Sequence, residues 1–274
     1  MRYLILILLI VSGCTSHPKE AVEFSEIECS ITEMPKYDGR KVSLLDTNGV
    51  AYKDTIVGQI EKRRTVFKPC RSYTYKADYY NSEDKLITTS RIRMTASGKR
   101  WHLQAEKQDE IIIQYEYTDQ DIKESLKYRL NKTLPNLVWQ AEEITGIIEN
   151  VEEVWMHPFR SNQFIFTEVA PFPMVRFPLE AGKEWTNQLS ILEGWGDWEN
   201  TVGNKSYKII GQETIETTYG QIKDCWKIES TSSFPFGQSK LDYWFDEELG
   251  FVKMNYQNYG NQSLDIELVE VNER

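Results

Sequence analysis

The dominant pattern along this chain is an alternation of hydrophobic and polar residues with a period of two, which predicts β-strands. The pattern is clearest in Glu110–Thr118, where Ile111, Ile113, Tyr115 and Tyr117 fall on one face of an extended chain. Polar residues are interspersed on the opposite face. This arrangement is typical of a half-buried strand in an antiparallel sheet.

Similar runs recur through most of the sequence, separated by short polar breaks that favour turns. The other predicted strands are Ser72–Asn81, Lys85–Thr95, Arg100–Ala105, Gln140–Glu149, Lys205–Ile215, Gln221–Ser232, Lys240–Phe245, Phe251–Gln257 and Ser263–Val271. Weak helical spacing predicts one short helix over 121–131. Regularly spaced strands with short turns predict a mainly β fold, an antiparallel meander that forms either a sandwich or a curved half-barrel.

One cysteine lies within these alternating runs and is expected to be a buried free thiol. The period of two places Ile222, Asp224, Trp226 and Ile228 on one face of their strand and Cys225 on the other. Two further cysteines, Cys29 and Cys70, lie in irregular segments, and export would allow a disulfide between them. The sequence leaves two alternatives open, a Cys29–Cys70 bridge or two free thiols.

The first residues of the chain have a different pattern. Arg2 precedes an apolar run over 4–11, and Ser12, Gly13 and Cys14 follow it. The run is too short to cross a bilayer, which takes about 20 apolar residues, but it fits a secretory signal. The small residues before Cys14 are typical of a bacterial lipoprotein signal, so we expect Cys14 to carry diacylglyceryl and palmitate chains. The alternative is an ordinary cleaved signal with an incidental cysteine.

These patterns divide the chain into four parts. Residues 1–13 are the predicted signal peptide, and residues 14–24 form a polar, lipidated tether. Residues 25–150 and 151–274 are two β-rich parts, expected to pack as one continuous body. Thr15 replaces the Asp that retains some lipoproteins at the inner membrane, so an outer-membrane location in the cell envelope is favoured over an inner-membrane one.

Charge excludes some classes of partner. Without Arg2 the mature chain has 31 basic and 42 acidic residues, a net charge of −11. Such an acidic chain is a poor candidate for binding nucleic acid, and anionic lipid headgroups would repel it. Attachment to the membrane is therefore expected through the acyl chains on Cys14. No cluster of cysteine and histidine has the spacing of a metal site, and we expect no metal and no cofactor.

The second half of the chain contains a series of short aromatic and glycine motifs. They are Phe177-Pro178-Leu179, Gly182-Lys183-Glu184-Trp185, Gly211-Gln212-Glu213-Thr214-Ile215, Thr218-Tyr219-Gly220, Cys225-Trp226-Lys227-Ile228, Tyr243-Trp244-Phe245 and Leu249-Gly250-Phe251-Val252-Lys253. Through these motifs, roughly residues 155–271 resemble a group of uncharacterised bacterial envelope lipoproteins with a β-rich domain. These are aromatic and glycine positions of a scaffold, so the resemblance implies a fold and no activity.

Residues 194–200 have the most unusual local composition, because two tryptophans alternate with glycines and acidic residues. If Trp195 and Trp198 are exposed, their flat rings could stack on a sugar, with Asp197 bonding its hydroxyl groups. This is the hypothesis of a glycan-binding lipoprotein. The alternative is a tryptophan-rich loop that packs over one end of the β core.

Catalytic chemistry has weaker support. His157 lies beside a proline with no recognisable nucleophile, and Asp197 and Glu199 are the most suggestive carboxylate pair for an envelope hydrolase. We therefore assign no catalytic residue. The preferred function is a non-enzymatic binding or assembly component with a lipid, glycan or envelope-protein partner, contacted through an apolar concave face or a sheet edge.

The anchoring hypothesis predicts that Cys14→Ser releases the protein from membranes, because the mature chain has no other expected attachment. Fractionation of cells should find the variant with the soluble proteins and the parent protein with the membranes. A variant that remains in the membrane fraction would contradict lipidation as the means of attachment.

Overall fold

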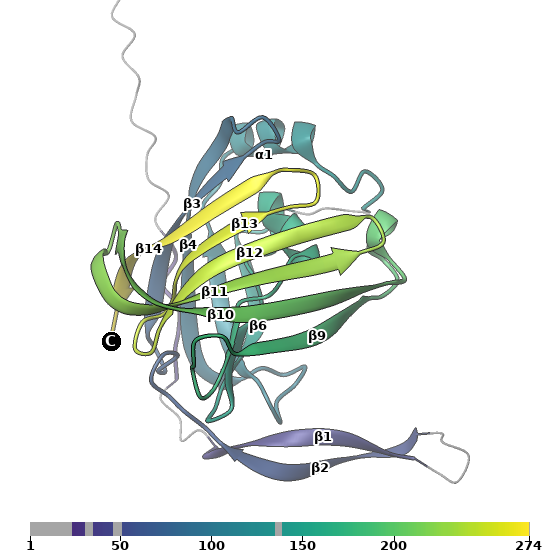
Figure 1. Cartoon of the computed structure of the whole chain (residues 1–274), viewed down its shortest axis with the longest axis vertical. Helices are drawn as coiled ribbons and strands as arrows, with labels where there is room; N and C mark the ends of the chain where they lie inside the picture. Colours follow the sequence, from purple (N-terminus) through teal and green to yellow (C-terminus); the bar gives the residue numbers. More distant parts are fainter. Residues whose placement is uncertain (1–23, 31–34, 46–50, 135–138, 274) are drawn as a thin grey trace, which may run out of the picture.

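The computed structural model describes residues 24–30, 35–45, 51–134 and 139–273 (Figure 1). The predicted signal peptide, Cys14 and the tether up to residue 23 lie outside the described residues. No helix within the described ranges has the length and apolarity needed to cross a membrane.

The body is one antiparallel sheet in the order β8-β7-β6-β5-β4-β3-β14-β13-β12-β11-β10-β9. It is strongly curved and open, with β8 and β9 at its edges (Figure 1). The strands are β3 Ser72–Tyr80, β4 Leu86–Arg100, β5 Asp109–Tyr115, β6 Glu142–Glu149, β7 Glu153–Met156, β8 Met174–Arg176, β9 Glu184–Ile191, β10 Thr201–Thr217, β11 Gly220–Phe234, β12 Gly237–Asp246, β13 Gly250–Gln257 and β14 Ser263–Asn272. The predicted mainly β meander is confirmed, in its half-barrel form.

A segment over 157–173, which we call the strap, covers the concave face of the sheet. It contains the 3-10 helix η2 (Asn162–Val169), and its Phe159 and Phe164 side chains are fully buried. The Phe159 ring lies 5.3 Å from Tyr75 of β3, and Phe164 lies 6.1 Å from Tyr115 of β5. The inward aromatic residues of the sheet thus pack against the strap and form a single core.

The short helix is present where it was predicted. It consists of α1 (Asp119–Ser125) and a turn of 3-10 helix, η1 (Leu126–Tyr128). Thr118 and Asp121 form a reciprocal capping box at its start. Such a cap satisfies two backbone N–H groups that would otherwise have no partner, which explains why the helix begins here.

Two predictions from the alternation are wrong, both because of irregular backbone. Arg100–Ala105 is not a strand, since β4 ends at Arg100 and the N–H of Trp101 turns back to the carbonyl of Gln108, 3.0 Å away. In β11, Asp224 has a φ of 54°, and the pairing with β10 shifts register beside it. A bulge reverses the faces that follow it, so Cys225 is buried on the side of Ile222. The expectation of a buried free thiol is confirmed.

The Cys29–Cys70 bridge is formed, which decides between the two alternatives for this pair. It joins residues 24–30 to Cys70, which lies two positions before the start of β3. The N–H of Ser30 also donates a 2.9 Å hydrogen bond to the Ser97 carbonyl of β4. The centroid of the Phe24 ring also lies 5.0 Å from the guanidinium carbon of Arg93. Residues 24–30 are therefore fixed to the outer surface of the sheet.

Replacing Cys29 and Cys70 together by serine should lower the free energy of unfolding by about 3 kcal/mol, because the bridge restricts a long loop of the unfolded chain. Urea unfolding of the parent and variant measures the difference. Reduction of the parent protein should produce a similar loss. Equal midpoints for the parent and the double variant would contradict this assignment of stability.

Candidate functional site

A two-stranded arm projects from one end of the half-barrel (Figure 1). It consists of β1 (Tyr37–Leu45) and β2 (Ala51–Glu61), which pair with each other in antiparallel register. Among the described residues neither strand pairs with a strand of the large sheet. An isolated hairpin is marginally stable in water, so this arm must be fixed at its base.

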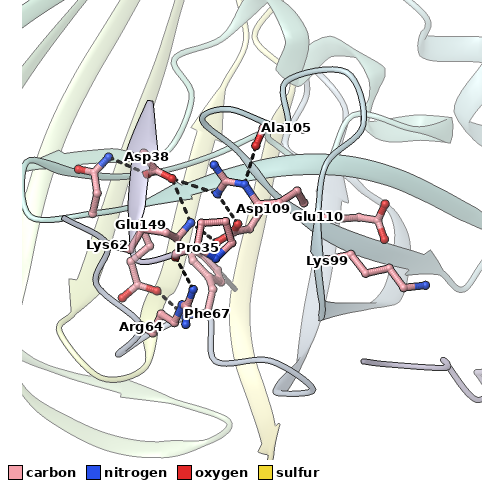
Figure 2. A network of polar contacts seen from close by, with 12 residues as sticks. Pro35, Asp38, Lys62, Arg64, Phe67, Lys99, Ala105, Asp109, Glu110 and Glu149 are labelled. Carbon is pink, nitrogen blue, oxygen red and sulfur yellow. Dashed lines mark hydrogen bonds and ion pairs between the residues drawn. The ribbon is translucent and has the colours of Figure 1, made fainter. Parts of the chain in front are cut away.

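Buried ion pairs fix the base of the arm (Figure 2). Asp38, in β1, lies 3.2 Å from the Lys62 ammonium that follows β2 and 3.0 Å from the Arg100 guanidinium of β4. Asp109 of β5 binds the same two cations, and its oxygen lies 2.6 Å from Arg100. The Asp38 side chain has no solvent exposure and that of Lys62 has 2 %. Two cations and two carboxylates, from β1, the residue after β2, β4 and β5, therefore compensate one another.

Hydrogen bonds complete the base. Asn150 donates its amide to the second Asp38 oxygen at 3.2 Å. The buried Glu149 carboxylate accepts three backbone N–H groups, from Thr65 at 2.8 Å, Val66 at 2.9 Å and Phe67 at 2.8 Å. The chain leaving β2 is thus bound to β6 before it enters the core. Charged groups with all partners present are stable when buried, whereas loss of one partner is costly.

A groove of about 1210 Å³ lies between the arm and the body. This is larger than a small-molecule cleft, which measures about 300 to 1,000 Å³. Its walls come from the arm, the turn after β4, the β6–β7 turn and the segment between β8 and β9, and they include Gly58, Gln59, Ile60, Leu103, Glu106, Lys107, Glu152, Glu153, Arg176, Phe177 and Lys183. Leu103 is 66 % exposed. The groove therefore combines an apolar contact surface with charges of both signs.

The predicted glycan site lacks an exposed tryptophan pair. Trp198 is 1 % exposed, and its indole N–H donates to the Tyr259 hydroxyl at 2.9 Å. Trp195 is half-buried and stacks on Trp198 with ring centroids 6.5 Å apart. Asp197 accepts a 2.5 Å hydrogen bond from Thr133. The premise of exposure is therefore wrong for Trp198, and the loop packs over the core.

The groups considered for hydrolysis have structural surroundings. His157 is enclosed by aromatic rings, with centroids at 4.6 Å for Trp155 and 5.5 Å for Trp101. Burial, together with the nearby Arg160 and Lys205 charges, lowers the pKa of His157 to about 3. The carboxylate of Glu199 accepts the N–H of Gly194 at 3.0 Å within its own loop. Within the described ranges, no three His, Cys, Asp or Glu side chains are grouped as metal ligands.

The fold is an open antiparallel half-barrel whose concave face is covered by the strap. No family model and no curated protein matches the chain. Solved structures similar to this chain include a protein from Bacteroides fragilis that is assigned as exported and has a YmcC-like fold. The sequence identity is 10% and the TM-score is 0.44. The match covers 77% of this chain and 100% of the other.

A second similar structure is assigned as a lipoprotein from Parabacteroides distasonis, with 13% identity, a TM-score of 0.43 and coverage of 77% and 99%. A third is a domain assigned as an outer membrane lipoprotein-sorting protein from Vibrio parahaemolyticus, with 7% identity, a TM-score of 0.22 and coverage of 74% and 84%. All three similar structures are assigned as bacterial exported proteins or lipoproteins.

Sequence reasoning did not identify the arm or the groove. The signal was present, because Asn48-Gly49 lies between two β-favouring runs and this dipeptide is a strong indicator of a hairpin. The groove itself has no local signal, since its walls come from four segments that are far apart in the chain.

Asp38→Asn should loosen the arm, because Lys62 and Arg100 would then share one buried carboxylate. The expected loss is about 3 kcal/mol of local stability. Hydrogen exchange of the β1 and β2 amides measures it, and the β11 and β12 amides should keep their protection. Glu247→Gln is the matched control, since its ion pair with Arg63 is largely exposed. Unchanged exchange in the arm of Asp38→Asn would contradict a role for these ion pairs.

Proposed function

We propose that this protein is an exported, lipid-anchored component of the cell envelope that binds an extended segment of another envelope protein. The binding site is the groove beneath the β1–β2 arm. The observation that carries this proposal is an arm whose described strands pair with no strand of the large sheet, fixed by buried ion pairs above a groove of about 1210 Å³. Backbone hydrogen bonds to the body occur only at the base among the described residues, where Gly39 donates to Glu106 and Glu61 accepts from Val151. The anchor is Cys14, and Thr15 favours the outer membrane.

The backbone of the arm favours a polypeptide ligand. A strand edge that has no neighbour presents a row of N–H and C=O groups, and an extended peptide can add to it as a further strand. The groove then supplies side-chain contacts. Exposed Leu103 suits an apolar side chain, and the nearby Glu152 and Arg176 suit charged ones. Backbone pairing would supply affinity, and these walls would supply specificity.

The other binding hypotheses have less support from the geometry. An apolar concave face for lipid is filled by the strap, whose Phe164 and Val169 have no exposure. A glycan platform at Trp195 and Trp198 requires exposed rings, and Trp198 is buried. The groove is the largest hollow described on the body.

Site-specific photo-crosslinking in the native cells tests the proposal. A photoreactive residue at Gln59 of the arm, and separately at Leu103 across the groove, should give a covalent adduct with one partner protein of the same mass. Lys208 is the control position, because it is an exposed residue on the outer face of β10.

Leu103→Asp should reduce the Gln59 adduct by at least tenfold, because a charge would be placed in the apolar part of the groove. The variant should keep the parent's thermal unfolding, since Leu103 contributes little to the core. Equal adducts at all three positions, or adducts with lipid or glycan alone, would exclude a protein segment as the ligand of this groove.

A further inference from the structure

A row of polar side chains crosses the concave face of the sheet from β9 to the end of β13. Strand register places Lys205 of β10 opposite Asn187 of β9 and opposite Ser232 of β11. Ser232 in turn faces Ser239 of β12, whose hydroxyl donates to Asn258 at 3.0 Å. Residues in such register lie side by side on one face. The row lies within a face that is otherwise rich in aromatic and aliphatic side chains.

Two polar groups of this row that could donate to an anion lack a partner in the protein. The Ser232 Oγ and Asn258 Nδ2 atoms are buried without a hydrogen bond. Lys205 is 2 % exposed, and among the described residues no carboxylate oxygen lies within 4.0 Å of its Nζ atom. Buried polar groups are almost always hydrogen-bonded, so a cluster of exceptions indicates a missing occupant.

The strap covers Lys205 from the other side. The Phe172 ring centroid lies 3.4 Å from the Lys205 Nζ atom. Glu168 is the acidic group of the strap that stabilises the Lys205 charge, but it is paired with Arg160 at 3.1 Å. An aromatic face attracts a cation but compensates a buried charge less fully than a carboxylate does. Lys205 therefore has a buried positive charge that is only partly compensated.

We propose that Lys205 is the anchor of a buried site for a small oxyanion, of the size of acetate or phosphate. The anion would lie between the sheet and the strap and accept hydrogen bonds from the Lys205 ammonium and the Ser232 hydroxyl. Phe172 of the strap would form the wall of this site opposite the sheet. This site is separate from the groove beneath the arm and does not rest on the proposed function.

Binding at this site should weaken as the pH rises. Burial lowers the pKa of Lys205 to about 7. Because the anion binds the protonated ammonium, Lys205 must take up a proton on binding at higher pH. The affinity should then fall by up to tenfold per pH unit above about pH 7. The titratable and charged groups that face Lys205 come from the strap and from its own strand. Burial lowers the pKa of His157 to about 3 and raises the pKa of Tyr207. Arg160 and Glu168 form an ion pair, and β9 and β11 contribute the uncharged Asn187 and Ser232.

Calorimetric titration and thermal unfolding of the full-length lipidated protein in detergent test the proposal. Sodium acetate and sodium phosphate are the probes, and sodium chloride at equal ionic strength is the reference. Either oxyanion should bind and raise the unfolding temperature of the parent protein, more at pH 6 than at pH 9. Lys208→Met, a substitution on the exposed outer face of the same strand, should behave like the parent.

Lys205→Met should lower oxyanion affinity at least tenfold and remove the dependence on pH. Ser232→Ala is a second variant that keeps the charge, and it should lower the affinity several-fold even if Lys205→Met does not fold. A response to acetate alone or phosphate alone identifies the preferred oxyanion. The proposal is overturned if chloride stabilises the protein equally, if neither oxyanion binds, or if binding is unchanged in both Lys205→Met and Ser232→Ala.

Discussion

The structure depends on one constraint, which is that an open, curved sheet must bury its concave face. A closed barrel would bury it with its own strands, but here β8 and β9 remain unpaired edges. The strap over 157–173 takes that role and contributes side chains such as Phe159, Phe164 and Val169. Burying a side chain of this kind contributes roughly 2 to 3 kcal/mol. The strap is thus as much a part of the core as the strands are.

The arm follows a different rule. Its two strands cannot bury a core of their own, so the charges at its base provide the attachment. Buried ion pairs add little net stability compared with apolar packing, but they require an exact arrangement of partners. Asp38 and Lys62 belong to the arm and its exit, whereas Arg100 and Asp109 belong to β4 and β5, so the arm has a defined direction relative to those strands. An orientation fixed in this way suits a binding element.

The sequence predicts the fold wherever alternation is uninterrupted, and it fails where the backbone departs from regular geometry. The face of β5 was correct because Ile111, Ile113 and Tyr115 follow an unbroken period of two. The face of β11 was wrong because a bulge at Asp224 shifts that period. The disulfide remained open because pairing depends on distance, and the groove could not be predicted because its walls meet only after folding. Local pattern determines strands, whereas sites depend on contacts between distant segments.

The Cys29–Cys70 bridge also has a mechanical meaning. In the proposed lipid-anchored form, nine residues lie between Cys14 and Phe24, which limits the distance between the anchor and the body to about 36 Å. Any force from the membrane then enters through a covalent bond next to β3. In the order of the sheet β3 and β14 are the two central strands. A pull on the anchor therefore loads the middle of the half-barrel, and the edge strands that could peel away bear none of it directly.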